Sequence, residues 1–154
     1  MKRFLIVPLS LMVLTLAQTA PAAPKKSPAP PDNAYMQKIL DAWATLNPAN
    51  VAMYYASGPH TFFDIAPLKY NSWDEYQTGV KAVLAGYTRA KFTLNDDAAI
   101  HTGGDPVWAT ATVSSEMTTK AGKVEMGNFR WTVIWQNEDG KWVIVHDHFS
   151  APIQ

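Results

Sequence analysis

The stretch that decides the fold lies near the C-terminus, at residues 130–152, and reads RWTVIWQNEDGKWVIVHDHFSAP. Asp139-Gly140 near its middle is a pair typical of tight hairpin turns, because both positions tolerate a left-handed backbone. Apolar and polar residues alternate on both sides of this pair, as they do in strands with one buried face. The stretch therefore predicts an antiparallel hairpin, with one strand over 124–135 and the last strand over 141–149.

The side-chain period of two assigns a face to every residue of this hairpin. In the strand 124–135, the wholly apolar face is expected to pack against helices: Phe129, Trp131, Val133 and Trp135. The last strand has one face with Val143, Val145, Asp147 and Phe149, and another with Trp142, Ile144, His146 and His148. We expect the first of these faces to be inside. A carboxylate there needs a partner, a hydrogen bond or a proton, so Asp147 either lies at an open rim, is satisfied by backbone or a Tyr hydroxyl, or belongs to a functional site.

Upstream of the hairpin, the sequence predicts helices first and strands afterwards. Helices are expected at 33–46, at 48–55 as a short segment beginning with Pro48, and from Ser72, with Glu75 completing a capping box, to about Thr88. A brief strand is expected at 61–64, and longer strands at 91–100 and 107–118, the latter with Val107, Ala109, Ala111, Val113 and Met117 inside. Helices gathered on one face of an antiparallel sheet define the α+β class.

The composition is that of one ordinary globular domain. The chain has 154 residues, 47% of them hydrophobic, and 13 basic residues balance 13 acidic ones. A zero net charge without clustered Lys or Arg argues against binding nucleic acid through its phosphates. The absence of cysteine excludes disulfides, thiolate nucleophiles and cysteine-based zinc sites.

The first 32 residues are expected to form a targeting signal followed by an extended linker. Lys2 and Arg3 precede an apolar run, and Ala20-Pro21-Ala22 fits a small-residue cleavage site, so residues 1–22 predict a signal peptide. An uncleaved anchor is the alternative, although the run is short for a membrane span. Residues 23–32 form a Pro/Ala-rich linker, which leaves a domain at 33–154. Export without cysteine predicts a periplasmic or secreted bacterial protein that no longer contacts the membrane after cleavage.

The closing stretch resembles the C-terminal hairpin of the SnoaL-like proteins, which belong to the nuclear-transport-factor-2-like superfamily. Its Asp-Gly-Lys-Trp turn and Val-His-x-His-x-Ser segment also resemble the association domain of calcium/calmodulin-dependent protein kinase II, and the similarity spans residues 33–152. The resemblance implies a cone-shaped, cystatin-like roll, in which a curved antiparallel sheet holds three N-terminal helices and one pocket on its concave face. It also implies a homodimer through the outer sheet face.

The same resemblance carries some functional residues over and not others. In ketosteroid isomerase, a member of the superfamily, the general base is an Asp at the end of the first strand, where this chain has Asp64. The isomerase's two oxyanion groups correspond to Ala42 and Thr132, so its mechanism does not carry over. Two pocket arginines of the kinase association domain correspond to Val133 and Phe149, so anion binding does not carry over either.

Two carboxylates are the candidate catalytic residues, Asp64 and Asp147. A carboxylate among rings has a raised pKa, which suits a general acid or base near neutral pH, and a Tyr hydroxyl would serve a developing oxyanion. The expected ligand-binding walls are aromatic: Trp43, Tyr54, Phe62, Trp73, Tyr76, Trp131 and Phe149. The alternative is that these rings are ordinary core and that Asp64 caps the following turn.

His146 and His148 point the same way on the last strand. They would bind a metal only if a third ligand, such as Glu116, joined them. The other interpretation places them in the dimer interface on the outer face, which is expected to consist of Arg130, Thr132, Trp142, Ile144, His146 and His148.

The sequence leaves two functions open, and neither calls for a cofactor. One is an isomerase, cyclase or dehydratase that acts on a small, largely apolar or aromatic molecule by carboxylate-mediated proton transfer. The other is a non-catalytic ligand-binding or dimerisation module of the periplasm.

Overall fold

The structure is a computed structural model that describes residues 28–152. The predicted signal peptide at 1–22 and the first half of the predicted linker lie outside the described residues. No helix among the residues described is long and apolar enough to span a membrane.

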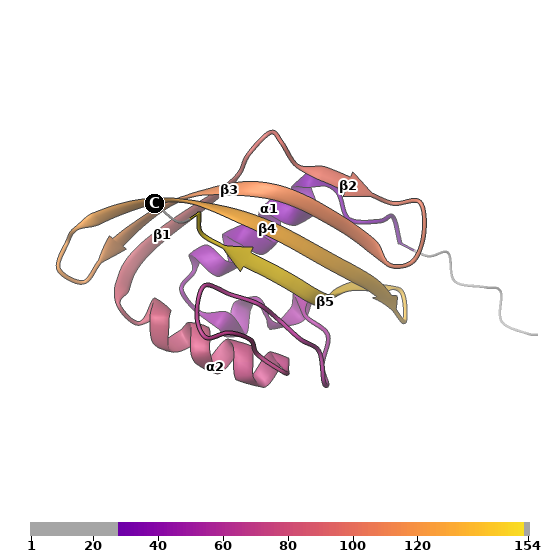
Figure 1. Cartoon of the computed structure of the whole chain (residues 1–154), viewed down its shortest axis with the longest axis horizontal. Coiled ribbons are helices and arrows are strands. Elements are labelled where there is room, and N and C mark those ends of the chain that lie inside the picture. The colour runs from indigo at the N-terminus through magenta and orange to yellow at the C-terminus, as the bar shows by residue number, and fades with distance from the viewer. Residues whose placement is uncertain (1–27, 153–154) are drawn as a thin grey trace, which may run out of the picture.

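A curved antiparallel sheet covers two helices (Figure 1). The strands are β1 (Tyr87–Leu94), β2 (Ala99–His101), β3 (Val107–Thr119), β4 (Val124–Glu138) and β5 (Lys141–Ser150). Their order is β1-β3-β4-β5, and β2 pairs with the part of β3 that β1 leaves free. The helices are α1 (Asn33–Ala44) and α2 (Trp73–Leu84). The chain is therefore α+β, as the sequence predicts, with its helices on the concave side of the sheet.

Both helices begin at the caps that the sequence indicates. The Asp32 carboxylate accepts a hydrogen bond from the Tyr35 amide at 2.8 Å at the start of α1. The Ser72 hydroxyl accepts one from the Glu75 amide at the start of α2. Glu75 reaches back to the Asn71 amide, one residue before the position that an ideal capping box uses. The third predicted helix ends at Leu84 rather than Thr88, because β1 already begins at Tyr87.

Two short predicted elements are replaced by tighter structure. Residues 48–55 form two 3₁₀ turns, η1 (Pro48–Asn50) and η2 (Ala52–Tyr54), and no continuous helix. The predicted strand at 61–64 is reduced to single bridges from Phe62 to Tyr70 and from Phe63 to His148. A further bridge joins Tyr55 to Ile144, so the segments around Tyr55 and Phe63 lie along the free edge of β5.

The predicted inner faces of β3 and β4 are confirmed. Val107, Ala109 and Val113 are buried on β3, and their register partners Trp135, Val133 and Phe129 point the same way on β4. Together with the apolar faces of α1 and α2, they form one continuous core.

The last strand contains a bulge that overturns half of its predicted face assignment. Ile134 pairs with His146 but Trp135 pairs with Ile144, so Val145 has no partner and the alternation changes phase there. Asp147 and Phe149 lie inside, as predicted. Trp142 and Ile144, which we expected on the outer face, lie opposite inward-facing residues and pack into the core. Val143 was expected inside, but it pairs with Gln136 of the other face.

Candidate functional site

A cavity of about 190 Å³ lies between the helices and the sheet. Its lining comes from α1, α2, all the long strands and the segment after Phe63: Leu40, Trp43, Asp64, Ile65, Tyr76, Val80, Val83, Leu84, Tyr87, Phe92, Met117, Phe129, Trp131, Asp147 and Phe149. Ile65 and Val83 are each 59% exposed, which places them where the cavity meets solvent. An apolar cavity of about 150 Å³ accommodates benzene, so this one suits a small, largely apolar molecule.

Asp147 is the most unusual group in the wall. Its position after the bulge turns it inward, and only 2% of the residue is exposed. Its Oδ2 accepts a hydrogen bond of 2.6 Å from the Tyr55 hydroxyl. Its Oδ1 is buried and has no hydrogen-bond partner within residues 28–152. One carboxyl oxygen is thus held by the protein, while the other remains available for a ligand or a proton.

Burial raises the pKa of Asp147 to about 7. The hydrogen bond from Tyr55 lowers this pKa, the nearby charge of Asp64 raises it, and the Trp131 side chain, as a further hydrogen-bond donor close by, lowers it. The carboxyl group therefore exchanges its proton close to neutral pH, which is the property that general acid–base catalysis needs.

Tyr55 is the residue beside Asp147 that the sequence did not indicate. Its hydroxyl accepts a hydrogen bond of 3.3 Å from Trp43 Nε1 and donates a hydrogen bond to Asp147. Its ring stacks on Trp73 at 4.3 Å between centroids. Burial and the Asp147 charge raise the pKa of Tyr55 well above its usual value, so Tyr55 stays a donor.

Tyr54, which the sequence predicts in the cavity wall, is not there, so this prediction is wrong. Tyr54 packs edge-on against Tyr35 at 5.6 Å and does not line the cavity. No regular period in the sequence pointed to Tyr55, although it stands four residues after Val51 and both are buried in the folded chain. One turn of helical geometry puts such a pair on a common face even when the local structure is 3₁₀ in part.

Asp64 lies in the same wall as Asp147, in the segment after the Phe63 bridge. Its Oδ1 accepts a hydrogen bond of 2.7 Å from the Ile65 amide, which is the local turn contact weighed as the alternative role. Burial raises the pKa of Asp64, and the hydrogen bond from Ile65 partly offsets that rise. The two predicted carboxylates therefore share one cavity, with Asp147 sealed inside and Asp64 half-buried.

The predicted aromatic walls divide into a lining and a support. Trp43, Tyr76, Trp131 and Phe149 line the cavity. Phe62 and Trp73 do not line it but lie behind it, where Phe62 stacks on Tyr76 at 5.4 Å and Trp73 stacks on Tyr55. Phe92 and Phe129, which were not among the predicted wall residues, also line it.

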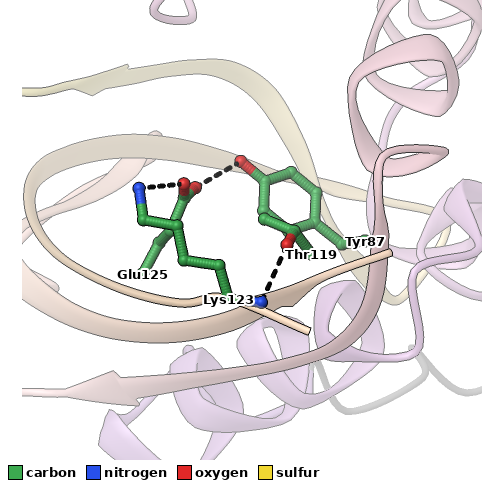
Figure 2. Close-up of polar contacts among 4 residues, drawn as sticks. All are labelled: Tyr87, Thr119, Lys123 and Glu125. Carbon is green, nitrogen blue, oxygen red and sulfur yellow. Dashed lines mark hydrogen bonds and ion pairs between the residues drawn. The ribbon is translucent and has the colours of Figure 1, made fainter. Parts of the chain in front are cut away.

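Tyr87 contributes its ring to the cavity and its hydroxyl to a polar cluster beside the β3–β4 turn. Figure 2 shows this hydroxyl directed at Glu125, which it contacts at 3.2 Å. Glu125 also pairs with Lys123 at 3.0 Å, and these contacts lower the pKa of Glu125. The Lys123 amide donates to the Thr119 hydroxyl at 3.1 Å, which ties the cluster to the end of β3. Because its hydroxyl is engaged there, Tyr87 offers the cavity an apolar surface.

His146 and His148 lie on the other face of β5 and flank the Phe63 ring edge-on, at 5.4 and 5.7 Å. His146 Nδ1 is 2.7 Å from the Thr61 carbonyl oxygen. Glu116 pairs with Met126 near the β3–β4 turn, whereas His148 lies opposite Thr132, so Glu116 does not join the histidines. In the part of the chain that the structure describes, no three potential metal ligands come together.

Comparison with known proteins places this geometry in a family. A family model described as a SnoaL-like domain matches residues 33–154. A search of curated protein sequences finds no match. Among solved structures, a calcium/calmodulin-dependent protein kinase II association-domain protein of Xanthomonas campestris is 24% identical, with a TM-score of 0.67, covering 79% of this chain and 85% of its own.

Two further structures share the fold at lower identity. A nuclear transport factor 2-like protein of Salmonella enterica is 15% identical, with a TM-score of 0.68 and coverage of 79% and 92%. A scytalone dehydratase-like protein of Novosphingobium aromaticivorans is 8% identical, with a TM-score of 0.67 and coverage of 77% and 79%. At these identities the similarity establishes the cone-shaped fold, whereas activity has to be argued from the site.

Proposed function

Because this chain belongs to the SnoaL-like domain family, we propose that it binds a small, largely apolar or aromatic molecule in its cavity and transfers a proton within that molecule through Asp147. The observation that carries the proposal is the Asp147 carboxyl group, which is buried in an apolar wall with one oxygen held by Tyr55 and the other unpartnered among the described residues. The reaction class is that of an isomerase or a lyase, without a cofactor.

The proton balance of such a reaction needs only the groups of this cavity. The Asp147 carboxylate would accept a proton from a carbon next to a carbonyl group of the ligand. The protonated acid would then return the proton to another carbon, which is an isomerisation, or to a hydroxyl group that leaves as water, which is a dehydration. A pKa of about 7 makes both directions accessible near neutral pH.

A second group is needed for the negative charge that develops on the carbonyl oxygen. Tyr76 is the best candidate, because it lines the cavity and its pKa is raised well above the usual value by burial and by the Asp147 charge. A tyrosine that stays protonated donates a hydrogen bond to an oxyanion. Tyr76 would take the role that the positions of Ala42 and Thr132 do not fill in this chain. Asp64, nearer to solvent, would tune the acid–base strength of Asp147 through its charge.

A non-catalytic binding or dimerisation module is the second candidate, and the outer face of the sheet favours it. Arg130, Thr132, His146 and His148 remain on that face after the bulge has turned Trp142 and Ile144 inward. The fold neighbour described as an association domain supports a homodimer through this face. Light scattering of the purified protein tests the dimer.

Export to the periplasm or medium also remains a proposal, and protein sequencing of the mature N-terminus tests the cleavage after Ala22.

The proposed proton transfer is tested by titrating Asp147 with and without ligand. We would label the aspartate carboxyl carbons, follow them by NMR across pH, and add small aromatic ketones and alcohols. A resonance titrating near pH 7 that shifts on ligand addition and vanishes in Asp147→Asn supports the proposal. Asp96→Asn is the matched control, since Asp96 is exposed. An Asp147 resonance that titrates near pH 4 and ignores every ligand would rule out the proposed chemistry.

A further inference from the structure

The charge of the cavity wall has one sign only. Two carboxyl groups, Asp64 and Asp147, line the cavity, and among the residues that the structure describes no Lys, Arg or His lines it. A buried carboxylate is stable only if it is paired, hydrogen-bonded or protonated. Within the wall, Tyr55 donates a hydrogen bond to Asp147 and the Trp131 side chain, a further donor close by, lowers the pKa of Asp147, but no residue supplies a counter-charge.

The unpartnered oxygen of Asp147 marks where a counter-charge is missing. Oδ1 is buried and has no hydrogen-bond donor in the described part of the chain. Asp147 itself is only 2% exposed and belongs to the cavity wall. A ligand that places a positive group here would complete the pairing that the protein leaves open.

The rest of the wall also suits a cation. Seven aromatic rings line the cavity: Trp43, Tyr76, Tyr87, Phe92, Phe129, Trp131 and Phe149. The faces of such rings carry negative electrostatic potential and attract ammonium groups, most strongly where water is excluded. Aromatic side chains combined with a carboxylate recognise alkylated ammonium groups better than neutral groups of the same shape.

We infer that the ligand of this cavity carries a positive charge, as a protonated amine or quaternary ammonium group on a small apolar or aromatic body, and that this group pairs with Asp147. The inference rests on the proposed function, because it concerns the ligand of the same cavity. It adds a charge to that ligand, and pairing with this charge would keep Asp147 ionised when the ligand is bound.

The inference predicts a characteristic dependence on pH. The titratable groups that face Asp147 are Asp64 from the neighbouring segment, Tyr55 from the turn after η2 and Tyr76 from α2. Both tyrosines have pKa values well above their usual range, so neither tyrosine changes charge in the neutral region, whereas Asp147, with a pKa of about 7, does. Below the pKa of Asp147, each pH unit should weaken binding of a cation by up to about tenfold, since binding must displace a proton.

The experiment compares two probes of the same shape, phenyltrimethylammonium and tert-butylbenzene, which differ by a quaternary nitrogen in place of carbon. Calorimetric titration of the full chain at pH 8 should show the cation binding about tenfold tighter or more. At pH 5.5 this preference should shrink or vanish, while the affinity for tert-butylbenzene stays the same. At pH 7, binding of the cation should release protons, seen as a heat that depends on the buffer.

Matched variants identify the residue responsible. Asp147→Asn should lose the preference for the cation yet still bind tert-butylbenzene, which shows that the variant is folded with its cavity intact. Asp96→Asn should keep the preference. Equal affinity for the two probes at pH 8, or a preference that survives in Asp147→Asn, overturns the inference and leaves the proposed function standing. If neither probe nor any neutral aromatic compound binds, the cavity is not a ligand site and both proposals fail.

Discussion

The two ends of the cone are built from the same kinds of residue and differ in how completely they are filled. At the filled end, which we define by Val107, Trp135 and Ile144, each side chain is at most 1% exposed. At the open end, defined by Tyr87, Phe129 and Phe149, the rings surround a cavity of about 190 Å³. Close packing is the rule in protein interiors, so a cavity of this size forfeits contact energy.

The difference shows that aromatic content alone does not distinguish a core from a pocket. What separates the two ends is the bulge at Val145, which turns Ile144 toward the core on one side and Asp147 toward the cavity on the other. The filled end should account for stability, and the open end for binding.

The largest effect on stability is expected when a large side chain is removed from the filled end. Trp135→Ala removes a side chain that is 0% exposed and should lower the free energy of unfolding by about 4 kcal/mol. Phe129→Ala only enlarges an existing cavity and should lower it by about 1–2 kcal/mol. Urea denaturation of both variants and the parent protein measures the difference. Equal losses at the two ends would contradict the contrast between them.

The next effect concerns the charge that the open end tolerates. The pKa of Asp147 is about 7 in the folded protein and near 3.8 when unfolded, so between these values the folded state binds the proton more tightly. Stability from this group is therefore complete below about pH 4 and is lost as the pH rises toward 7. Asp147→Asn removes this dependence and should raise the free energy of unfolding at pH 8 by up to about 4 kcal/mol relative to the parent protein.

Denaturation curves from pH 4 to pH 8 measure that effect. The parent protein should become less stable than Asp147→Asn as the pH rises, and the two should converge near pH 4. Asp96→Asn controls for loss of a surface charge. Parallel pH profiles for parent and Asp147→Asn would mean that the carboxyl group is not held in an unfavourable environment.

Strand alternation predicted the chemically important feature of the open end and failed beside it. The inward direction of Asp147 follows from the period of two, counted back from Phe149, because the strand is regular between those residues. The same count placed Ile144 and Trp142 outside, since a bulge leaves no clear mark in a run such as Trp-Val-Ile-Val. A one-residue irregularity reverses every later assignment, so one end of β5 was predictable and the other was not.

The composition of the site was predictable only in part, for a similar reason. The lining rings of α1, α2 and β4 follow from helical and strand spacing, whereas Asp64 was predicted from the resemblance to ketosteroid isomerase. Tyr55 does not, because η1 and η2 are 3₁₀ turns whose side chains follow no single period across the break at Val51. Its contact with Asp147 joins residues that are 92 positions apart, and only the folded chain shows it.

A smaller effect is expected from removing the hydrogen bond that joins Asp147 to Tyr55. Tyr55→Phe keeps the ring on Trp73 but removes the donor to Oδ2, and should lower the free energy of unfolding at pH 8 by about 1–2 kcal/mol. Because that hydrogen bond favours the carboxylate, its loss should also raise the pKa of Asp147 above about 7. NMR titration of the labelled carboxyl group measures the shift. Tyr54→Phe is the control and should leave this pKa unchanged, since Tyr54 does not approach Asp147.

The smallest effect in stability, and the finest test of the open end, comes from two tyrosines that line the same cavity. Tyr87→Phe should change the free energy of unfolding by no more than about 0.5 kcal/mol and leave ligand affinity unchanged, because the Tyr87 hydroxyl is engaged by Glu125 (Figure 2). Tyr76→Phe should weaken the binding of ligands that carry a carbonyl oxygen and leave the affinity for other ligands unchanged. The reason is that the Tyr76 hydroxyl is the hydrogen-bond donor that we assign to the ligand. Calorimetric titration of an aromatic ketone and its hydrocarbon analogue against both variants separates these outcomes. If Tyr87→Phe impairs ketone binding and Tyr76→Phe does not, the polar group that reads the ligand lies at the β3–β4 turn rather than on α2.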